Sequence, residues 1–367
     1  NSLVDYTTFC KTDLLNGITP IFEFCHDTKP VSVLTYPKKQ LILTARRDNV
    51  TGQYYQINDV TDVDTAFNFS NNDPTSAGVP TSRGWANRMD IAAAGGNGVD
   101  ISANADIYVA YGNTQSAANR GLMLNYNLGN SGLIDASWNI INLDSTMKVK
   151  YVSIAVSGNG DSDPTSNVYI SYQDHDNDNI YFKRKNVISS SVGGGSIYTT
   201  GNNSDSSIAI GPEAGVNTNV FIVWLNGNDP YNVVFARSTD NGAIWEWRDS
   251  GNWATVDPTA ALPTDAKVAT GTYTEKAVNI SAQDNNNLYV SYTDSGQKLQ
   301  LLKSTTGGES WSLPIEAANN VSYVNNMTIT GTGATTKIYI SYYGGSVSDL
   351  GLAYSDDNGT TWYQHIT

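Results

Sequence analysis

Residues 168–172 read Val-Tyr-Ile-Ser-Tyr, a short apolar segment dominated by β-branched and aromatic residues. Such residues favour extended strands. Segments of the same kind recur along the chain, at Leu41–Ala45, Ile107–Tyr111, Val168–Tyr172, Val220–Trp224, Leu288–Tyr292 and Ile338–Tyr342. They begin about 59 residues apart on average, which marks an internal repeat that occupies nearly the whole chain.

Each repeat predicts four strands. A further apolar run precedes each quoted segment, and a polar loop, a third strand and a turn rich in Gly, Asn, Asp and Ser follow it. A small antiparallel sheet of this kind cannot bury both of its faces alone, whereas radial packing around an axis covers them and leaves few open edges. The quoted segments are nearly continuously apolar, as expected for strands covered on both faces.

We therefore predict an all-β chain, a six-bladed β-propeller of four-stranded antiparallel blades that forms a single domain over residues 1–367. The predicted blades lie near residues 31–70, 89–140, 150–190, 207–247, 278–312 and 327–367. Residues 1–30 are expected to close the ring, with Ile21–Phe24 pairing against the last blade. The glycines at 193–195 lie in a serine-rich stretch and are interpreted as a flexible turn.

Composition and charge exclude several classes of partner. The chain of 367 residues carries 35 acidic and 21 basic residues, a net charge of −14. That balance repels phosphate backbones, so nucleic acid is not an expected partner. The longest clearly apolar run, near Val220–Leu225, is far shorter than the ~20 residues that a spanning helix needs, so no membrane insertion is expected.

The two cysteines, Cys10 and Cys25, lie in one short stretch without metal-site spacing around them. This favours a disulfide over free thiols, and with it an oxidising compartment. Closing a loop of about 15 residues would stabilise the N-terminal segment by roughly 3 kcal/mol. The first residue, Asn1, is not an initiator Met, which is typical of a processed chain. We expect a secreted or cell-surface protein.

Three turns share a pattern of small, acidic, glycine and tryptophan positions. They consist of Ser238, Asp240, Gly242 and Trp245, of Ser304, Gly308 and Trp311 with Thr306 in the acidic place, and of Ser355, Asp357, Gly359 and Trp362. The pattern resembles the Asp-box, also called the BNR repeat, of sialidase-like propellers. The resemblance implies a structural turn on the face opposite the binding surface, in which the carboxylate accepts backbone N–H groups and the glycine adopts positive φ.

The loops between second and third strands are the expected binding surface, because function concentrates on loops that a rigid scaffold presents. Acidic, arginine and aromatic residues gather there, a mixture that suits sugar rings and their hydroxyl groups. The predicted ligand-binding residues are Arg46, Arg47, Asp48, Asp174, Asp176, Trp224, Tyr292 and Asp294. For the aromatic members, packing between blades is the open alternative, and for the arginines it is a solvated loop.

Catalysis is not favoured by the sequence. The resemblance implies that an active sialidase needs three arginines from separate blades, a Tyr/Glu nucleophile pair and an Asp acid/base. No arginine follows Arg248, and Glu275 with nearby Tyr273 is the one candidate nucleophile pair. No catalytic residue is assigned; any enzyme would be a glycoside hydrolase using two carboxyl groups about 5 to 10 Å apart.

A calcium loop is a weaker possibility. Asp174, Asp176 and Asp178 alternate as calcium ligands do, but Asn179 and Lys185 stand where a helix-loop-helix calcium site has Gly and Glu. No other cofactor is expected.

The leading hypothesis is a non-catalytic, extracytoplasmic module that binds a glycan or a cell-surface protein. The alternatives are a sialidase-like exo-glycosidase and a self-assembling structural subunit of a cell-surface layer or appendage.

Overall fold

The computed structural model describes residues 34–35, 40–41, 46–47, 54–55, 89–95, 105–113, 121–127, 139–157, 165–187, 189–211, 218–227, 230–272, 278–344 and 350–366. Within these ranges the chain is almost entirely β-structure, with two short 3-10 turns, η2 (Thr264–Ala266) and η3 (Gly333–Thr335). No helix among the described residues is long and apolar enough to cross a membrane.

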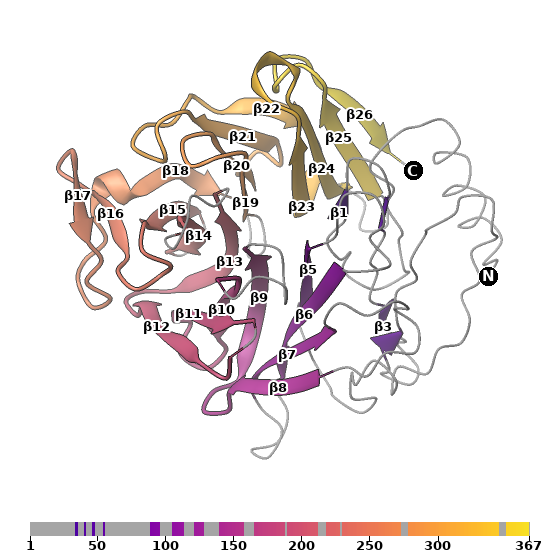
Figure 1. The fold of residues 1–367 in the computed structure, drawn as a ribbon. Helices are drawn as coiled ribbons and strands as arrows, with labels where there is room; N and C mark the ends of the chain where they lie inside the picture. Colours follow the sequence, from indigo (N-terminus) through magenta and orange to yellow (C-terminus); the bar gives the residue numbers. More distant parts are fainter. Residues whose placement is uncertain are drawn as a thin grey trace, which may run out of the picture.

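Five antiparallel sheets of four or more strands follow one another along the chain (Figure 1). The first contains β5 (Met89–Gly95), β6 (Ala105–Asn113), β7 (Gly121–Asn127) and β8 (Asn139–Asp144). The second contains β9 (Val149–Val156), β10 (Asn167–Asp174), β11 (Ile180–Asn186) and β12 (Val192–Tyr198). The third contains β13 (Asn203–Ile210), β14 (Val220–Asn226), β15 (Tyr231–Ser238), β16 (Glu246–Asp249), β17 (Asn252–Thr255) and β18 (Lys267–Thr272).

The last two sheets repeat the four-stranded plan. One contains β19 (Val278–Ala282), β20 (Leu288–Thr293), β21 (Leu299–Ser304) and β22 (Ile315–Ala318). The other contains β23 (Val321–Thr330), β24 (Lys337–Gly344), β25 (Leu350–Ser355) and β26 (Tyr363–Ile366). Figure 1 shows these sheets around a common centre, with the first strand of each sheet innermost. The arrangement is propeller-like.

The second strand of each sheet is buried on both faces, as its continuous apolar sequence predicts. All six residues of β20 are buried, as are the first six of β14. Alternate residues of these strands face opposite neighbours: Trp224 packs in a cluster shared with the preceding sheet, and Val223 packs in one shared with the following sheet. A strand in this position buries side chains in both directions, and its polar residues, such as Ser171 and Ser291, are buried as well.

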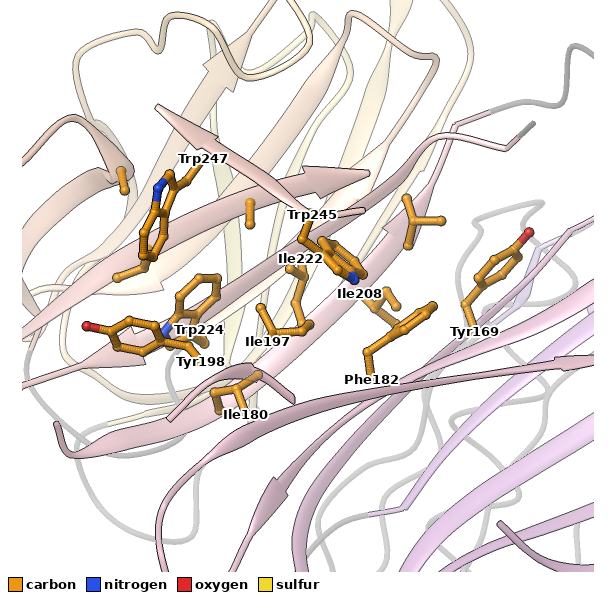
Figure 2. Close-up of a cluster of buried hydrophobic side chains, with 14 residues drawn as sticks. Tyr169, Ile180, Phe182, Ile197, Tyr198, Ile208, Ile222, Trp224, Trp245 and Trp247 are labelled. Carbon is orange, nitrogen blue, oxygen red and sulfur yellow. The ribbon is translucent and has the colours of Figure 1, made fainter. Parts of the chain in front are cut away.

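Four apolar clusters fill the gaps between consecutive described sheets. The richest lies between the β9–β12 sheet and the sheet that begins with β13 (Figure 2). In it, the Phe182 ring meets the edge of Trp245 at a centroid distance of 5.1 Å, and Tyr198 meets Trp247 at 5.8 Å. Edge-to-face aromatic contacts of this kind add to the stabilisation that apolar burial provides.

Hydrogen bonds also link the innermost strands. The Asp90 carboxylate on β5 accepts the backbone N–H of Ile154 on β9, at 2.9 Å. Ser153 Oγ on β9 accepts the N–H of Ile208 on β13, and Ser207 Oγ on β13 accepts the N–H of Ile280 on β19. One side-chain acceptor at the equivalent strand position thus joins each of the first three described sheets to the next around the centre.

The structure describes a sheet of four or more strands in five of the six stretches where a blade is expected, and the third sheet extends past residue 247 to Thr272. Within residues 31–70 the structure describes only β1 (Leu34–Thr35) paired with β2 (Gln40–Leu41), and β3 (Arg46–Arg47) paired with β4 (Tyr54–Tyr55). Residues 1–30, including Cys10 and Cys25, lie outside the described residues, so the disulfide, the closing role of this segment and the sixth blade stay predictions.

Two features differ from expectation. Residues 193–195 are not a turn, because they belong to β12 and pair with β11. The third sheet carries an extra hairpin: β15 meets β16 at one residue pair, while β18 pairs along the same edge of β15. This hairpin, β16–β17, has no counterpart in the repeated pattern.

Candidate functional site

The strand order gives the molecule two distinct faces. Because the strands within each sheet are antiparallel, the connections between second and third strands share one face with the starts of the first strands. We name this the loop face. The connections between third and fourth strands lie on the opposite face, which we name the turn face.

On the turn face, the three related turns form the hydrogen bonds that their residues predict. Asp240 Oδ1 accepts the N–H groups of Ala243 and Ile244 at 3.0 and 2.9 Å, and Ser238 Oγ accepts the N–H of Gly242 at 2.8 Å. The turn at Ser355 repeats this arrangement, with Asp357 accepting from Thr360 and Thr361. In the turn at Ser304, Thr306 Oγ1 replaces the carboxylate and accepts the N–H of Ser310.

The glycine and tryptophan of each turn pack against the preceding sheet. Gly242 has φ 81°, and a Cβ there would collide with the ring of Phe182 on β11. Gly308 stands in the same relation to Phe235 on β15, whose ring meets Trp311 edge-on at 5.2 Å. Trp362 packs against the cluster that contains Leu301. These contacts hold each turn against the preceding sheet.

In two of the turns, a tyrosine hydroxyl and a cationic side chain of the preceding sheet also donate hydrogen bonds to the asparagine that precedes the glycine. Tyr169 donates its hydroxyl to Asn241 Oδ1, and Arg184 donates to the carbonyl of the same asparagine at 3.1 Å. Tyr289 and Lys303 bond Asn358 in the same way, at 2.9 and 2.7 Å. The turn face is therefore built from groups that already satisfy one another.

On the loop face, the three aspartates that follow β10 are held in a turn. Asp174, almost fully buried, accepts the N–H of Asp176 through Oδ1 and the Asn177 amide through Oδ2. Asp176 is exposed; its Oδ1 accepts Lys148 Nζ at 3.0 Å and lies 3.1 Å from His175 Nδ1. These two contacts, the Lys148 bond first, lower the pKa of Asp176 below its ordinary value.

The third aspartate, Asp178, adopts φ 55° and accepts the Gln173 amide Nε2 at 2.8 Å. The same Nε2 donates to the carbonyl of Asn203 on β13 at 2.5 Å. An amide donor thus already occupies Asp178 Oδ1, one of the oxygens that a cation would need. Across the described residues, no group of three or more His, Cys, Asp or Glu side chains is placed to hold a metal ion. Calcium binding at Asp174, Asp176 and Asp178 stays a prediction, without geometric support.

The remaining predicted ligand-binding residues are not brought together. Trp224 is fully buried and Tyr292 is 3% exposed, which favours the packing alternative for both. Asp294, half-buried after β20, accepts the N–H groups of Gly296 and Lys298 and the Gln300 amide. Arg46 and Arg47 form β3 opposite Tyr55 and Tyr54. Asp48, Tyr273 and Glu275 lie outside the described residues.

The contacts do assemble a polar surface across two adjacent sheets. The loop after β10 is tied to β13 through Gln173 and Asn203, and Asn226 donates to Asn203 Oδ1 at 2.8 Å. Gly227 N–H donates to the carbonyl of Asn202, which is exposed. We name the accessible members of this set the loop-face polar surface: they are Lys148, His175, Asp176, Asn202 and Asn226, and the buried Asn203 links them beneath.

Of the predicted ligand-binding residues, only Asp176 belongs to this surface. Lys148 precedes β9 and reaches Asp176 across 28 residues. The asparagines belong to the connection before β13 and the end of β14, whereas the prediction examined acidic and aromatic residues in one loop at a time. A count of amide side chains at the starts of the first strands and at the ends of the second strands would have found them.

A polar contact also joins the first described sheet, at the end of β8, to the β9–β12 sheet. Tyr172 donates its hydroxyl to Asp144 Oδ2 at 2.9 Å, and Lys183 Nζ lies 3.3 Å from the same oxygen. Burial raises the pKa of Asp144, but the hydrogen bonds from Thr146 and Tyr172 and the charge of Lys183 outweigh it, so the pKa lies below its ordinary value. Burial and then the Asp144 charge raise the pKa of Tyr172. The Tyr172 hydrogen bond and the Lys183 ion pair hold the Asp144 carboxylate between the two sheets, which is a structural role.

No protein-family model and no curated protein matches the chain. Solved structures do match. A variant of Aleuria aurantia lectin in complex with alpha-methyl-L-fucoside matches with a TM-score of 0.50 and 13% identity, covering 76% of this chain and 78% of that chain. A variant of AofleA from Arthrobotrys oligospora matches with a TM-score of 0.48 and 13% identity, covering 90% and 80%.

A polysaccharide lyase described as a PL25 ulvan lyase matches with a TM-score of 0.47 and 11% identity, covering 89% of this chain and 78% of that chain. The likeness to the Aleuria lectin supports a β-propeller-like fold. At 13% identity it concerns the fold alone.

Proposed function

We propose that the protein is an extracytoplasmic Asp-box propeller of six blades that binds a glycan on its loop face and does not turn it over. The observation that supports this proposal is the loop-face polar surface, where amide, carboxylate, imidazole and ammonium groups lie on the same face of two sheets that Gln173 and Asn203 link. Sugar hydroxyls act both as donors and as acceptors, so a surface that offers both kinds of group suits them.

The fold supports the same proposal. The matched Aleuria aurantia protein is named as a lectin and is bound to alpha-methyl-L-fucoside. A rigid set of sheets that presents loops on one face is a scaffold on which binding residues vary freely. We therefore extend carbohydrate binding, and not a particular sugar, to this chain.

The three arginines whose side chains the structure describes favour binding over sialidase-like hydrolysis. Arg184 is bonded to the turn at Asn241, on the turn face. Arg237 stacks on Trp253 at 3.5 Å and pairs with Glu246, while Arg248 pairs with Glu309. Arg184 and Arg248 thus contact turns of the following sheet, and Arg237 contacts β16 and β17 of its own sheet. All three contacts lie towards the turn face, so none of these three side chains serves a substrate carboxylate on the loop face.

An array of immobilised glycans, including fucosylated oligosaccharides, tests the proposal with three proteins. These are the unchanged chain, the double variant His175→Ala with Asn202→Ala, and the control Leu313→Ser, which alters a residue 86% exposed on the connection between β21 and β22. We expect retention by the unchanged chain and the control and its loss in the double variant. Absence of binding to every glycan, or release of sugar products in solution, would contradict the proposal.

A further inference from the structure

The loop-face polar surface contains one lysine, and the charge of that lysine is already paired. Lys148 Nζ donates to Asp176 Oδ1 at 3.0 Å, and the two side chains are 36% and 49% exposed. The same carboxylate oxygen lies 3.1 Å from His175 Nδ1. The Lys148 bond and then the His175 contact lower the pKa of Asp176, so this carboxylate is ionised at neutral pH. A ligand that approaches Lys148 therefore meets an anion bonded to it.

Further carboxyl groups lie around this pair. Asp174, which is 3% exposed, and Asp178 belong to the same loop after β10 as Asp176. Asp205 is fully buried near the start of β13, at the loop-face end of the next sheet. Lys150, near the start of β9, adds a second ammonium group, which lies 5.3 Å from the centre of a tyrosine ring. Four carboxyl groups thus accompany two ammonium groups at these ends of the two sheets.

The sequence of the second of these sheets makes the imbalance larger. Residues 186–236 contain three acidic residues and no Lys, Arg or His. This stretch includes β13, β14 and the connection that follows β14, and it supplies Asn202 and Asn226 to the polar surface. The asparagine side of the surface therefore has no cation of its own, in a chain whose net charge is −14.

Given the glycan binding proposed above, on which this rests, we infer that the loop-face polar surface binds a neutral glycan and excludes glycans that carry a carboxylate or a sulfate. Asp176 imposes the exclusion by keeping Lys148 paired. Specificity is a difference between two binding free energies, and a like charge placed against the unwanted ligand is one way to create it.

The two kinds of ligand make different demands on this surface. The hydroxyl groups of a neutral sugar need donors and acceptors, which amide, imidazole and carboxylate groups offer without any net charge. An anionic sugar would have to displace Asp176 from Lys148 and then lie beside the remaining carboxyl groups. Both steps cost binding free energy that a neutral sugar does not lose.

An array that carries each neutral oligosaccharide beside the same oligosaccharide with one sialic acid or one sulfate tests the inference, with titration of the pairs that bind. We expect the unchanged chain to bind the neutral member at least about tenfold more tightly. The ratio should shrink in about 0.5 M salt, because salt screens the repulsion. Equal or tighter binding of the anionic member would overturn the inference and leave glycan binding intact. Absence of binding to every glycan would contradict the proposed function, and this inference with it.

Variants at the ion pair test the role of Asp176. Asp176→Asn keeps the shape of the side chain and one carbonyl acceptor but frees Lys148, so the anionic member should gain about tenfold relative to the neutral one. Adding Lys148→Met to this variant should remove the gain, which would identify the freed ammonium group as its source. Circular dichroism checks that each variant is folded.

Glu316→Gln is the matched control. Glu316 pairs with Lys298 at 2.6 Å on the β19–β22 sheet, and these side chains are 44% and 46% exposed. The variant therefore changes the net charge by the same amount and frees a lysine away from the polar surface, so the ratio should stay as in the unchanged chain. A ratio that Asp176→Asn leaves unaltered, or that both single variants alter equally, would overturn the role of Asp176.

Discussion

The hydroxyl of Tyr289 on β20 donates a 2.9 Å hydrogen bond to Asn358 Oδ1, in a turn that belongs to the next sheet. Tyr169 and Asn241 form the same bond one pair of sheets earlier. Both asparagines adopt positive φ, of 59° and 62°, and immediately precede the glycine of the turn. A recurrent turn thus serves as the joint between neighbouring sheets.

Tyr289→Phe removes this bond while keeping the buried ring. We expect a loss of about 1 kcal/mol in the free energy of unfolding, the usual worth of one buried hydrogen bond. Chemical denaturation measures it. Tyr363→Phe, at a hydroxyl on the exposed strand β26, is the control and should be neutral; equal losses in the two variants would contradict a specific joint at Asn358.

Gly242→Ala adds a methyl group at φ 81° against the ring of Phe182, which is itself fixed between Tyr169 and Trp245. Backbone strain and overpacking together should cost about 3 kcal/mol. Gly251→Ala supplies the matched control, because Gly251 has φ 78° with no atom within 4 Å of a Cβ. The difference between the two variants isolates the clash, and equal losses would show that backbone strain alone is responsible.

Much of the fold was predictable because strands that are buried on both faces require nearly continuous apolar sequences, and Val-Tyr-Ile-Ser-Tyr and its relatives are recognisable as such. The turn contacts of Ser238, Asp240 and Gly242 were predictable for the same reason, since local hydrogen bonding fixes those residue types. The β16–β17 hairpin occurs once and has no period that reveals it. β12 was misread because glycines usually break strands, whereas here pairing with β11 outweighs their low strand propensity.

The site was less predictable than the fold. Asp174 and Asp294 look like ligands in the sequence, yet each accepts backbone N–H groups of its own loop. A sequence does not distinguish a carboxylate that caps a turn from one that faces a ligand. Trp224 and Tyr292 end apolar strands, and only the position of the neighbouring sheet decides that both are buried.

Acid should remove the stabilisation that the Asp357 carboxylate gives to its turn. Hydrogen bonds, the backbone N–H of Thr361 first, lower the pKa of Asp357 from 3.8 to about 2. A carboxyl group with a lower pKa in the folded state contributes stability that is present above the unfolded pKa and disappears as pH falls through the folded pKa. The contribution therefore vanishes between about pH 4 and pH 2.

Thermal unfolding of the unchanged chain and of Asp357→Asn measures this contribution. Above about pH 5 the variant should unfold at a lower temperature, and the difference should narrow towards zero near pH 2. Thr306 holds the equivalent place in the turn at Ser304 without a charge, so Thr306→Ala is a control whose effect should not vary over this range. A gap for Asp357→Asn that stays constant with pH would contradict the assignment.

Calcium should leave the loop after β10 unchanged. The Gln173 amide lies between Asp178 and the carbonyl of Asn203, and Lys148 pairs with Asp176, so the oxygens already have donors. Binding of a ligand to the folded state raises the unfolding temperature by mass action. We expect equal unfolding temperatures in millimolar calcium and in chelator for the unchanged chain and for Asp178→Ala. A rise in calcium that Asp178→Ala abolishes would establish the metal site that the alternating aspartates suggested.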